Sequence, residues 1–306
     1  MNILILECTT FSEKTSQDAH VRQCFFIKKY LESKGHKVDM PQPDDFKNFI
    51  KKYDVIIKSY TSFYENYKDI IRILLANKNS KIFYLTNEYK ILNSCGTLDR
   101  KILREAGINY SIIANFNLPT KKVSYCVNLN CLFFKQKQPQ KKRFNICYYG
   151  TFRENRAKYF KKYFNNDDFI LSTSPKNFKK FKSIGCKFKP CQKFVWNKNK
   201  DTLGLFKYSL YIEDEFTHTT YNHLADRFYE ALSNDTIILF DKSCLNTLQK
   251  SEIKDLNYQK FVIDNLDDLN NRNYEEDLKE QNSWKKVIEQ EQIKNLEKIE
   301  KILLEG

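Results

Sequence analysis

Short apolar runs alternate with helical patterns along the first 140 residues of the chain. Runs of mostly apolar residues between polar stretches predict strands at 2–6, 37–40, 54–58, 81–85 and 111–114. Apolar residues spaced three and four apart predict helices at 21–34, 44–52, 67–76 and 97–105. Strands and helices that alternate at this short spacing are typical of a doubly wound α/β sheet.

The same alternation restarts after a stretch rich in lysine and glutamine at 136–143, which is typical of a linker or an exposed edge. Strands are predicted at 145–149, 169–172, 236–240 and 261–263, and a mixed segment at 205–213 ends in a further strand. Helices are predicted at 154–164 and 176–184, from 221 onwards, and at 274–305. The pattern therefore predicts an α/β protein with two Rossmann-like lobes that face a cleft, followed by a long terminal helix.

The helix predicted from 221 carries a candidate nucleotide-binding pair. Arg227 and Glu230 stand three residues apart and therefore lie on one side of the helix. The forked guanidinium could bind a diphosphate, and the carboxylate could bind a ribose hydroxyl. The alternative is an ion pair on the surface of the helix, which would have no function.

The composition excludes several classes of site. At 306 residues with seven glycines, the chain contains neither the G-x-G-x-x-G fingerprint nor a P-loop, so a nucleotide must be held by side chains. No run of eighteen apolar residues and no secretion signal is present, which predicts a cytoplasmic protein without membrane contact. The nine cysteines form no C-x-x-C pair and predict reduced thiols.

Positive charge is concentrated in one part of the chain. Residues 121–200 contain 21 Lys and Arg against three acids, and aromatic residues stand among them. These aromatic residues are Phe133, Phe134, Phe144, Tyr148, Tyr149, Phe152, Tyr159, Phe160, Tyr163 and Phe164. Such a band favours a polyanionic partner, either a nucleic acid or nucleotide phosphates. The alternative is a proteome that is rich in lysine throughout.

The segment 148–156 ends a predicted strand and begins a predicted helix. Gly150 allows the backbone to approach a ligand closely, and Thr151 offers a hydroxyl at the helix start. Arg153 and Arg156 would lie on the first turn, where the helix dipole attracts anions and disfavours cations. Arginines in that place favour a phosphate site over a solvated helix face.

Three short motifs resemble the DNA β-glucosyltransferases of T-even bacteriophages, which have the GT-B fold. The motif YGTFR at 149–153, with Arg156 after it, is similar to a Gly-Gly-Ser-Phe-Arg stretch of that family. The Arg-x-x-Glu helix of the family resembles Arg227–Glu230, which here also precedes a short apolar strand. The segment SKIFYLTNE at 80–88 is similar to a family segment that ends in the catalytic aspartate, and it puts Glu88 in that place.

The resemblance implies a role for each matched residue. Arg153, Arg156 and Arg227 would bind the diphosphate, and Glu230 the ribose hydroxyls. Glu88 would be the catalytic base, and its position after a predicted buried strand also fits a ligand site at the carboxyl edge of a sheet. Weaker matches are Phe194, whose backbone would pair with uracil, and Asp214. A family glutamate on the first helix falls near Arg22 or Gln23, so that acceptor-side role is absent or has moved to Asp18 or His20.

The implied function is inverting transfer of a sugar, with glucose as the first candidate, from UDP-glucose to hydroxymethylcytosine in double-stranded DNA. The implied place is the cytoplasm, which is that of the host if a bacteriophage encodes the protein. Residues 1–140 with the terminal helix 283–306 would form the acceptor-side lobe, and 141–282 the nucleotide-sugar-binding lobe. A divalent metal is compatible with this chemistry, but the sequence shows no ligand set. His218 and His223 stand five residues apart and would not share a helix face, which favours two solvated loop histidines. The alternatives are a GT-B transferase acting on a bacterial surface glycan, and a non-catalytic nucleic-acid-binding protein.

Overall fold

Two compact units divide the chain in the computed structural model. The structure describes residues 1–9, 19–59, 66–86, 101, 103–115, 124–132, 134–196, 199–215, 217–221 and 223–306. Unit 1 is Met1–Phe133 together with Gln292–Gly306, and unit 2 is Phe134–Glu291. The acceptor and donor roles that the sequence assigned to the two halves stay predictions.

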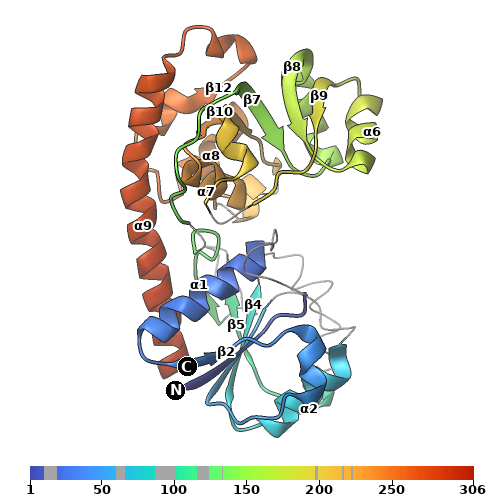
Figure 1. Ribbon diagram of the computed structural model, residues 1–306, viewed down its shortest axis with the longest axis vertical. Helices are drawn as coiled ribbons and strands as arrows, with labels where there is room; N and C mark the ends of the chain where they lie inside the picture. Colours follow the sequence, from blue (N-terminus) through green and yellow to red (C-terminus); the bar gives the residue numbers. More distant parts are fainter. Residues whose placement is uncertain are drawn as a thin grey trace. The chain divides into compact units, whose positions relative to one another are not determined.

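Unit 1 is built on a parallel six-stranded sheet in the order β2-β1-β3-β4-β5-β6 (Figure 1). The strands are β1 (Asn2–Leu6), β2 (Lys37–Asp39), β3 (Val55–Lys58), β4 (Lys81–Thr86), β5 (Ser111–Ala114) and β6 (Tyr125–Cys126). Helix α1 (Ala19–Ser33), the 3₁₀ turn η1 (Pro43–Asn48) and helix α2 (Tyr67–Ala76) connect the first four strands. One face of the sheet packs against α2 and η1, so that the apolar side chains of β1 and β3 are buried there.

Unit 2 repeats this architecture with the order β12-β11-β10-β7-β8-β9. Its strands are β7 (Phe144–Tyr149), β8 (Asn165–Ser172), β9 (Lys187–Cys191), β10 (Phe206–Tyr211), β11 (Ile237–Asp241) and β12 (Val262–Ile263). Its helices are α5 (Ala157–Tyr163), α6 (Pro175–Ser183), α7 (Asp226–Ser233) and α8 (Leu245–Leu248). The chain adds strands outward from β7 on one side and then continues with β10 on the other side. Sheets of this kind bind ligands at the carboxyl ends of the two strands where the order reverses.

The final helix α9 (Tyr274–Glu305) contributes to both units. In unit 2, the Gln281 side chain accepts a hydrogen bond from the N–H of Ile238 at 2.9 Å and donates one to its carbonyl at 2.8 Å. In unit 1, Glu300 accepts a hydrogen bond from the Tyr30 hydroxyl at 3.0 Å. The predicted return of the terminal helix to the first lobe is therefore confirmed.

Most predicted strands and helices are present, and the errors have local causes. The sequence missed β6, which has two residues, and β9, whose lysines and proline are typical of an edge strand that avoids pairing with other chains. Helix α7 begins at Asp226 rather than 221, because Thr217–Tyr221 form a short π-helical turn. Most of the predicted helix 97–105 lies outside the described residues.

The aromatic residues of the basic band mostly form the core of unit 2. Phe152, Phe160, Tyr163 and Phe164 are each at most 8% exposed, and their rings pack between the helices and the sheet. The band therefore consists of amphipathic elements with aromatic residues inside and lysines outside. The sequence predicted that aromatic rings and lysines alternate on one binding surface. For Phe152, Phe160, Tyr163 and Phe164 this prediction is wrong.

Candidate active site

The turn after β7 requires a glycine. Gly150 has a φ of +149°, a backbone conformation that residues with a Cβ rarely adopt. A Cβ at this position would also lie 3.2 Å from the Tyr148 hydroxyl. The Gly150 N–H donates to the carbonyl of Ser172 at 3.3 Å, and its carbonyl accepts from the Thr173 hydroxyl at 2.7 Å. The turn is thus fixed to the end of β8.

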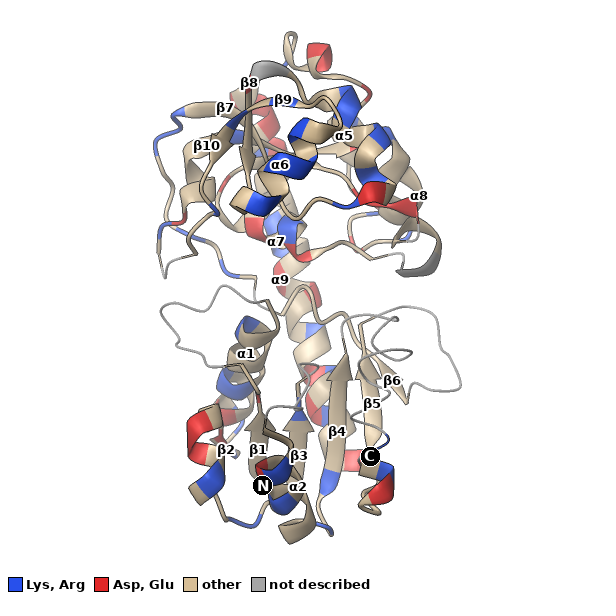
Figure 2. Ribbon diagram, turned by 90° about the vertical axis from the view of Figure 1, so that its right-hand side faces the viewer, with Lys and Arg blue, Asp and Glu red and all other residues tan. Residues whose placement is uncertain are grey.

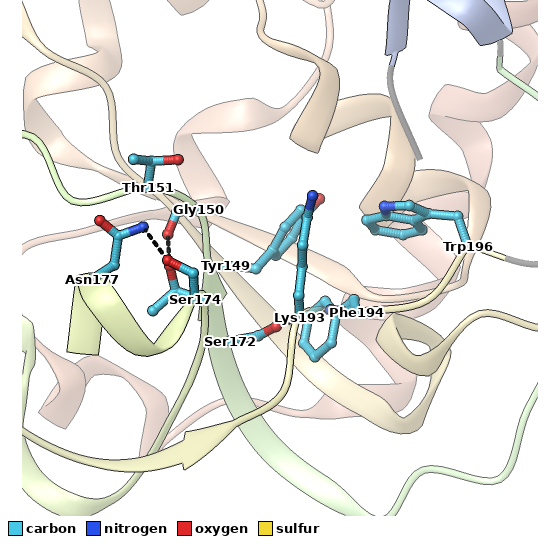
Figure 3. Close-up of a pocket in the computed structure, with 10 residues that line it drawn as sticks. Tyr149, Gly150, Thr151, Ser172, Ser174, Asn177, Lys193, Phe194 and Trp196 are labelled. Atoms are coloured by element: carbon cyan, nitrogen blue, oxygen red, sulfur yellow. Dashed lines mark hydrogen bonds between the residues drawn. The ribbon is translucent and has the colours of Figure 1, made fainter. Parts of the chain in front are cut away.

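A pocket of about 200 Å³ lies at the carboxyl ends of β7, β8 and β9 (Figure 3). It is lined by Tyr149, Gly150, Thr151, Ser172, Thr173, Ser174, Asn177, Lys193, Phe194 and Trp196. One side is aromatic: the ring centroid of Tyr149 lies 5.4 Å from that of Phe194 and 5.7 Å from that of Trp196. The opposite side offers hydroxyls and an amide. Pockets that enclose a whole drug-sized ligand measure roughly 300–1,000 Å³, so this pocket suits one ring system of a larger ligand.

The structure brings together three residues that the sequence predicted for donor binding, namely Gly150, Thr151 and Phe194. The N–H of Phe194 donates to the Ser172 hydroxyl at 3.1 Å, and that hydroxyl donates to the carbonyl of Gln192 at 2.9 Å. The amide of Phe194 is therefore already engaged by the protein. Pairing of the Phe194 backbone with uracil stays a prediction, and it would have to use the carbonyl.

The sequence missed most of the other pocket residues. Ser172, Thr173 and Ser174 form one small polar run that begins with the last residue of β8, directly after its apolar residues 169–171, and this signal could have identified them. Lys193 and Trp196 follow β9, which the sequence did not predict, so their position was not visible.

Arg156 is held by two carboxylates that follow β10. Its guanidinium lies 2.5 Å from Glu213 Oε2 and 3.1 Å from Asp214 Oδ2, and only 4% of the residue is exposed. Burial alone would lower the pKa of Arg156, but the charges of Glu213, Tyr148 and Asp214 together outweigh it and raise that pKa. Arg156 therefore stays charged inside the protein. Glu213 was not among the residues that the sequence singled out.

Arg227 reaches the same carboxylate from α7. Its guanidinium lies 3.3 Å from Glu213 Oε1 and donates to the carbonyl of Ile212 at 2.9 Å. It also lies over the rings of Tyr148 and Tyr211, 5.7 and 5.8 Å from their centroids. Burial would lower the pKa of Arg227, yet Glu213 and the tyrosines keep it raised. Glu213 thus lies between two arginines at the reversal of strand order between β7 and β10.

Glu230 is buried against the pocket residue Tyr149 rather than lying on the surface of α7. It is 7% exposed, and its Oε2 accepts a hydrogen bond from the Tyr149 hydroxyl at 3.0 Å. Burial first, and then the charge of Glu230, raise the pKa of Tyr149 well above its ordinary value, so this hydroxyl stays protonated and donates. The alternative of a solvated Arg227–Glu230 surface pair is wrong, because both side chains face inward to other partners.

Arg153 differs from Arg156 in its surroundings. Arg153 is exposed and immediately precedes the 3₁₀ turn η3 (Glu154–Arg156), whereas Arg156 closes that turn and is buried. The expected first helical turn with two arginines side by side is therefore not formed. Diphosphate binding by these two residues stays a prediction.

A second cluster of buried polar groups lies at the carboxyl edge of the sheet in unit 1. His20 and Gln23, which the sequence proposed for the acceptor side, are buried on α1. Glu7 directly follows β1, and its Oε1 accepts the N–H of Thr9 at 2.8 Å and lies 3.7 Å from His20 Nε2. Lys58, the last residue of β3, is also buried. Glu7 and Lys58 were missed, although a charged residue at the end of an apolar strand marks such an edge.

Two predicted residues, Asp18 and Glu88, lie outside the described residues. Among the residues that are described, no group of three His, Cys, Asp or Glu side chains could hold a metal ion.

His218 is buried, and its Nδ1 lies 2.8 Å from the Thr247 hydroxyl. Burial lowers the pKa of His218. The interpretation of His218 as a solvated loop residue is therefore wrong.

No helix within the described parts of the chain combines the length and apolar character needed to cross a membrane.

The charge state of Asp214 gives a pH prediction. Burial would raise the pKa of Asp214, but the N–H of Thr217 and the charge of Arg156 lower it below its ordinary value. A group with a depressed folded-state pKa contributes stability above its unfolded pKa of about 3.9 and loses it as the pH falls through the folded value. We expect the free energy of unfolding to fall more steeply between pH 5 and 2.5 in the wild type than in Asp214→Asn. Urea titrations at each pH measure this, and parallel curves would contradict it.

Comparisons with known proteins support the fold. No protein-family model and no curated protein matches the sequence. Among solved structures, an α-glucosyltransferase in complex with UDP and a 13-mer DNA containing a central A:G mismatch aligns with 97% of this chain and 94% of its own, at a TM-score of 0.56 and 12% identity. CapF with the inhibitor 3-isopropenyl-tropolone (17% identity, TM-score 0.26, 43% of this chain and 37% of that one) is too dissimilar to carry an argument. The same holds for NAD⁺-bound 3-phosphoglycerate dehydrogenase of Entamoeba histolytica (13% identity, TM-score 0.24, 95% and 93%). The predicted α/β fold with two Rossmann-like lobes is confirmed, and this chain shares it with a glucosyltransferase over nearly its whole length.

Proposed function

We propose that this protein transfers a sugar, glucose in the first place, from a UDP-sugar to a hydroxymethylated base in double-stranded DNA, with inversion at the anomeric carbon. One observation carries the proposal. An aromatic pocket at the carboxyl ends of β7, β8 and β9 lies in the same unit as the buried Arg156 and the largely buried Arg227, in a fold shared with a glucosyltransferase that was solved with UDP and DNA. Fold likeness alone does not define an activity, so the proposal depends on this site.

The donor would be held by side chains and by one turn of backbone. The uracil ring would stack among Tyr149, Phe194 and Trp196, with its N–H donated to the Phe194 carbonyl. Glu230 already accepts a hydrogen bond from the pocket residue Tyr149 and would accept a ribose hydroxyl with its carboxylate. Arg227 would turn from Glu213 toward the diphosphate, because a doubly charged ligand competes for the same guanidinium.

The transfer itself would need one base and one stabilised leaving group. The hydroxymethyl oxygen of the base attacks the anomeric carbon, the bond from that carbon to the diphosphate oxygen breaks, and the acceptor proton passes to Glu88. The arginines stabilise the charge that develops on the departing UDP. His20 and Gln23 would contact the acceptor, together with Asp18.

A transfer assay tests the proposal directly. The protein is incubated with a panel of UDP-sugars and either hydroxymethylated or plain duplex DNA, and the digested nucleosides are analysed by mass spectrometry and NMR. We expect one hexose on the modified base only, in the β configuration. Transfer to a soluble glycan and not to DNA would support the surface-glycan alternative. DNA binding without any UDP binding would support a non-catalytic module.

Replacing Arg227 tests the donor site. We expect Arg227→Met to weaken UDP binding by roughly 10- to 100-fold in calorimetry, because a hydrogen bond to a charged group contributes about 1.5–3 kcal/mol. Arg143→Met removes an exposed arginine next to the opposite end of β7 and serves as the control. Equal UDP affinity in the two variants would remove Arg227 from the donor site.

A further inference from the structure

Helices α5 and α6 lie side by side on one face of the unit 2 sheet (Figure 2). The ring of Phe160 on α5 lies 4.7 Å from that of Phe181 on α6, and both side chains are fully buried. The opposite, outward side of the two helices carries exposed lysines. We call this surface the lysine face; its residues are Lys158, Lys161, Lys176, Lys179, Lys180 and Lys182.

The lysine face has one sign of charge. Helices α5 and α6 together carry seven lysines and no Asp or Glu. The seventh, Lys162, is only partly exposed and pairs with Asp241 at 3.2 Å and Asp264 at 2.5 Å. In the described part of the chain, none of the six lysines of the face has such an acidic partner within ion-pair distance. Their charge is therefore available to an external anion.

The composition of the whole chain does not explain this surface. Helix α9 carries nine acids and six lysines, so both signs alternate along it, as on ordinary solvated helices. Lysines also protect edge strands from pairing with other chains, which accounts for those on β9 but not for those on helices. The same chain thus contains a mixed-charge helix and a purely basic pair of helices.

We propose that the lysine face docks the phosphate backbone of duplex DNA, independently of base sequence. The choice of DNA as the polyanion rests on the proposed function. A single strand would need exposed aromatic platforms for stacking, whereas Phe160 and Phe181 are buried beneath the helices and Tyr159 and Phe178 are only partly exposed. Repeated point charges on a convex helical pair suit the regularly spaced phosphates of a duplex. This docking would hold long DNA on the protein while the modified base is bound elsewhere.

The test uses the full chain with four substitutions on α6, namely Lys176→Gln, Lys179→Gln, Lys180→Gln and Lys182→Gln. A matched variant has the same change in net charge on α9, through Lys279→Gln, Lys286→Gln, Lys294→Gln and Lys298→Gln. Affinity for a plain 30-base-pair duplex is measured by fluorescence anisotropy over a range of salt concentrations. Each phosphate contact contributes about 0.9 to the slope of log K against log salt, so the α6 variant should lose about 3–4 units of slope. The α9 variant should stay within about one unit of the wild type.

Several results would overturn the proposal. Equal losses in the two variants would show that net charge alone attracts DNA, and an unchanged slope in the α6 variant would show that the face does not touch it. Tighter binding of single-stranded DNA or of anionic lipid vesicles than of the duplex would assign the face to another partner. UDP affinity is measured in parallel. If the wild type neither binds UDP nor transfers sugar, the proposed function is refuted. If the α6 and α9 variants still differ in salt slope as expected, the lysine face nevertheless binds DNA.

Discussion

Glu88→Gln should lower the rate of sugar transfer by on the order of 10²–10⁴, which is the usual contribution of a general base. Glutamine keeps the size of the side chain and much of its hydrogen bonding, but it cannot accept the acceptor proton. In sequence, Glu88 follows the carboxyl end of β4 by two residues, at the edge where parallel sheets place their ligands. A base that acts only while the oxygen attacks should affect turnover and leave UDP affinity unchanged.

Single-turnover rates and calorimetry with UDP separate these two effects. Glu105→Gln changes an exposed carboxylate in unit 1 that pairs with Lys101, and it should transfer sugar at the wild-type rate. If Glu88→Gln stays within about threefold of the wild type, Glu88 is not the base. Asp18→Asn and His20→Asn would then be compared in the same assay, because Asp18 directly precedes α1 in the sequence and His20 on α1 lies 3.7 Å from Glu7, which follows β1.

The fold could be predicted because parallel sheets leave a simple pattern. Their central strands are buried on both faces, so β1, β3 and β11 appear as short continuous apolar runs between polar loops. Edge strands lack this pattern. β9 has the sequence KFKPC, in which only Phe188 is a large buried apolar residue, and the sequence gives no reason to place a strand there.

The candidate site could be predicted only where one short segment contains it. The glycine turn after β7 and the Arg227–Glu230 pair are local, and both lie where the sequence placed them. The partners of the arginines are not local: Glu213 stands 57 residues after Arg156, and nothing in the sequence links them. The same limitation explains why the prediction for the aromatic residues of the basic band was wrong. Spacing alone does not show whether an aromatic ring on a helix faces DNA or the core.

Arg156→Met should destabilise unit 2 by about 3–5 kcal/mol, which is the usual effect of removing one partner from a buried ion pair. The variant would leave Asp214, at 3% exposure, without its guanidinium, and Glu213, at 2% exposure, with Arg227 in place of two arginines. The exposed Arg153→Met is the matched control and should change the free energy of unfolding by less than about 0.5 kcal/mol.

Urea unfolding at pH 7, followed by tryptophan fluorescence, measures the loss in each variant. Adding Asp214→Asn to Arg156→Met removes the carboxylate that has lost its guanidinium, while Glu213 keeps its pair with Arg227, and should restore part of the lost stability. Such a rescue would identify Arg156 as the residue that holds the two carboxylates in place, with diphosphate binding left to Arg227 and Arg153. A loss below about 1 kcal/mol in Arg156→Met would instead mean that the guanidinium is not needed to neutralise them, and that it is free to bind the donor.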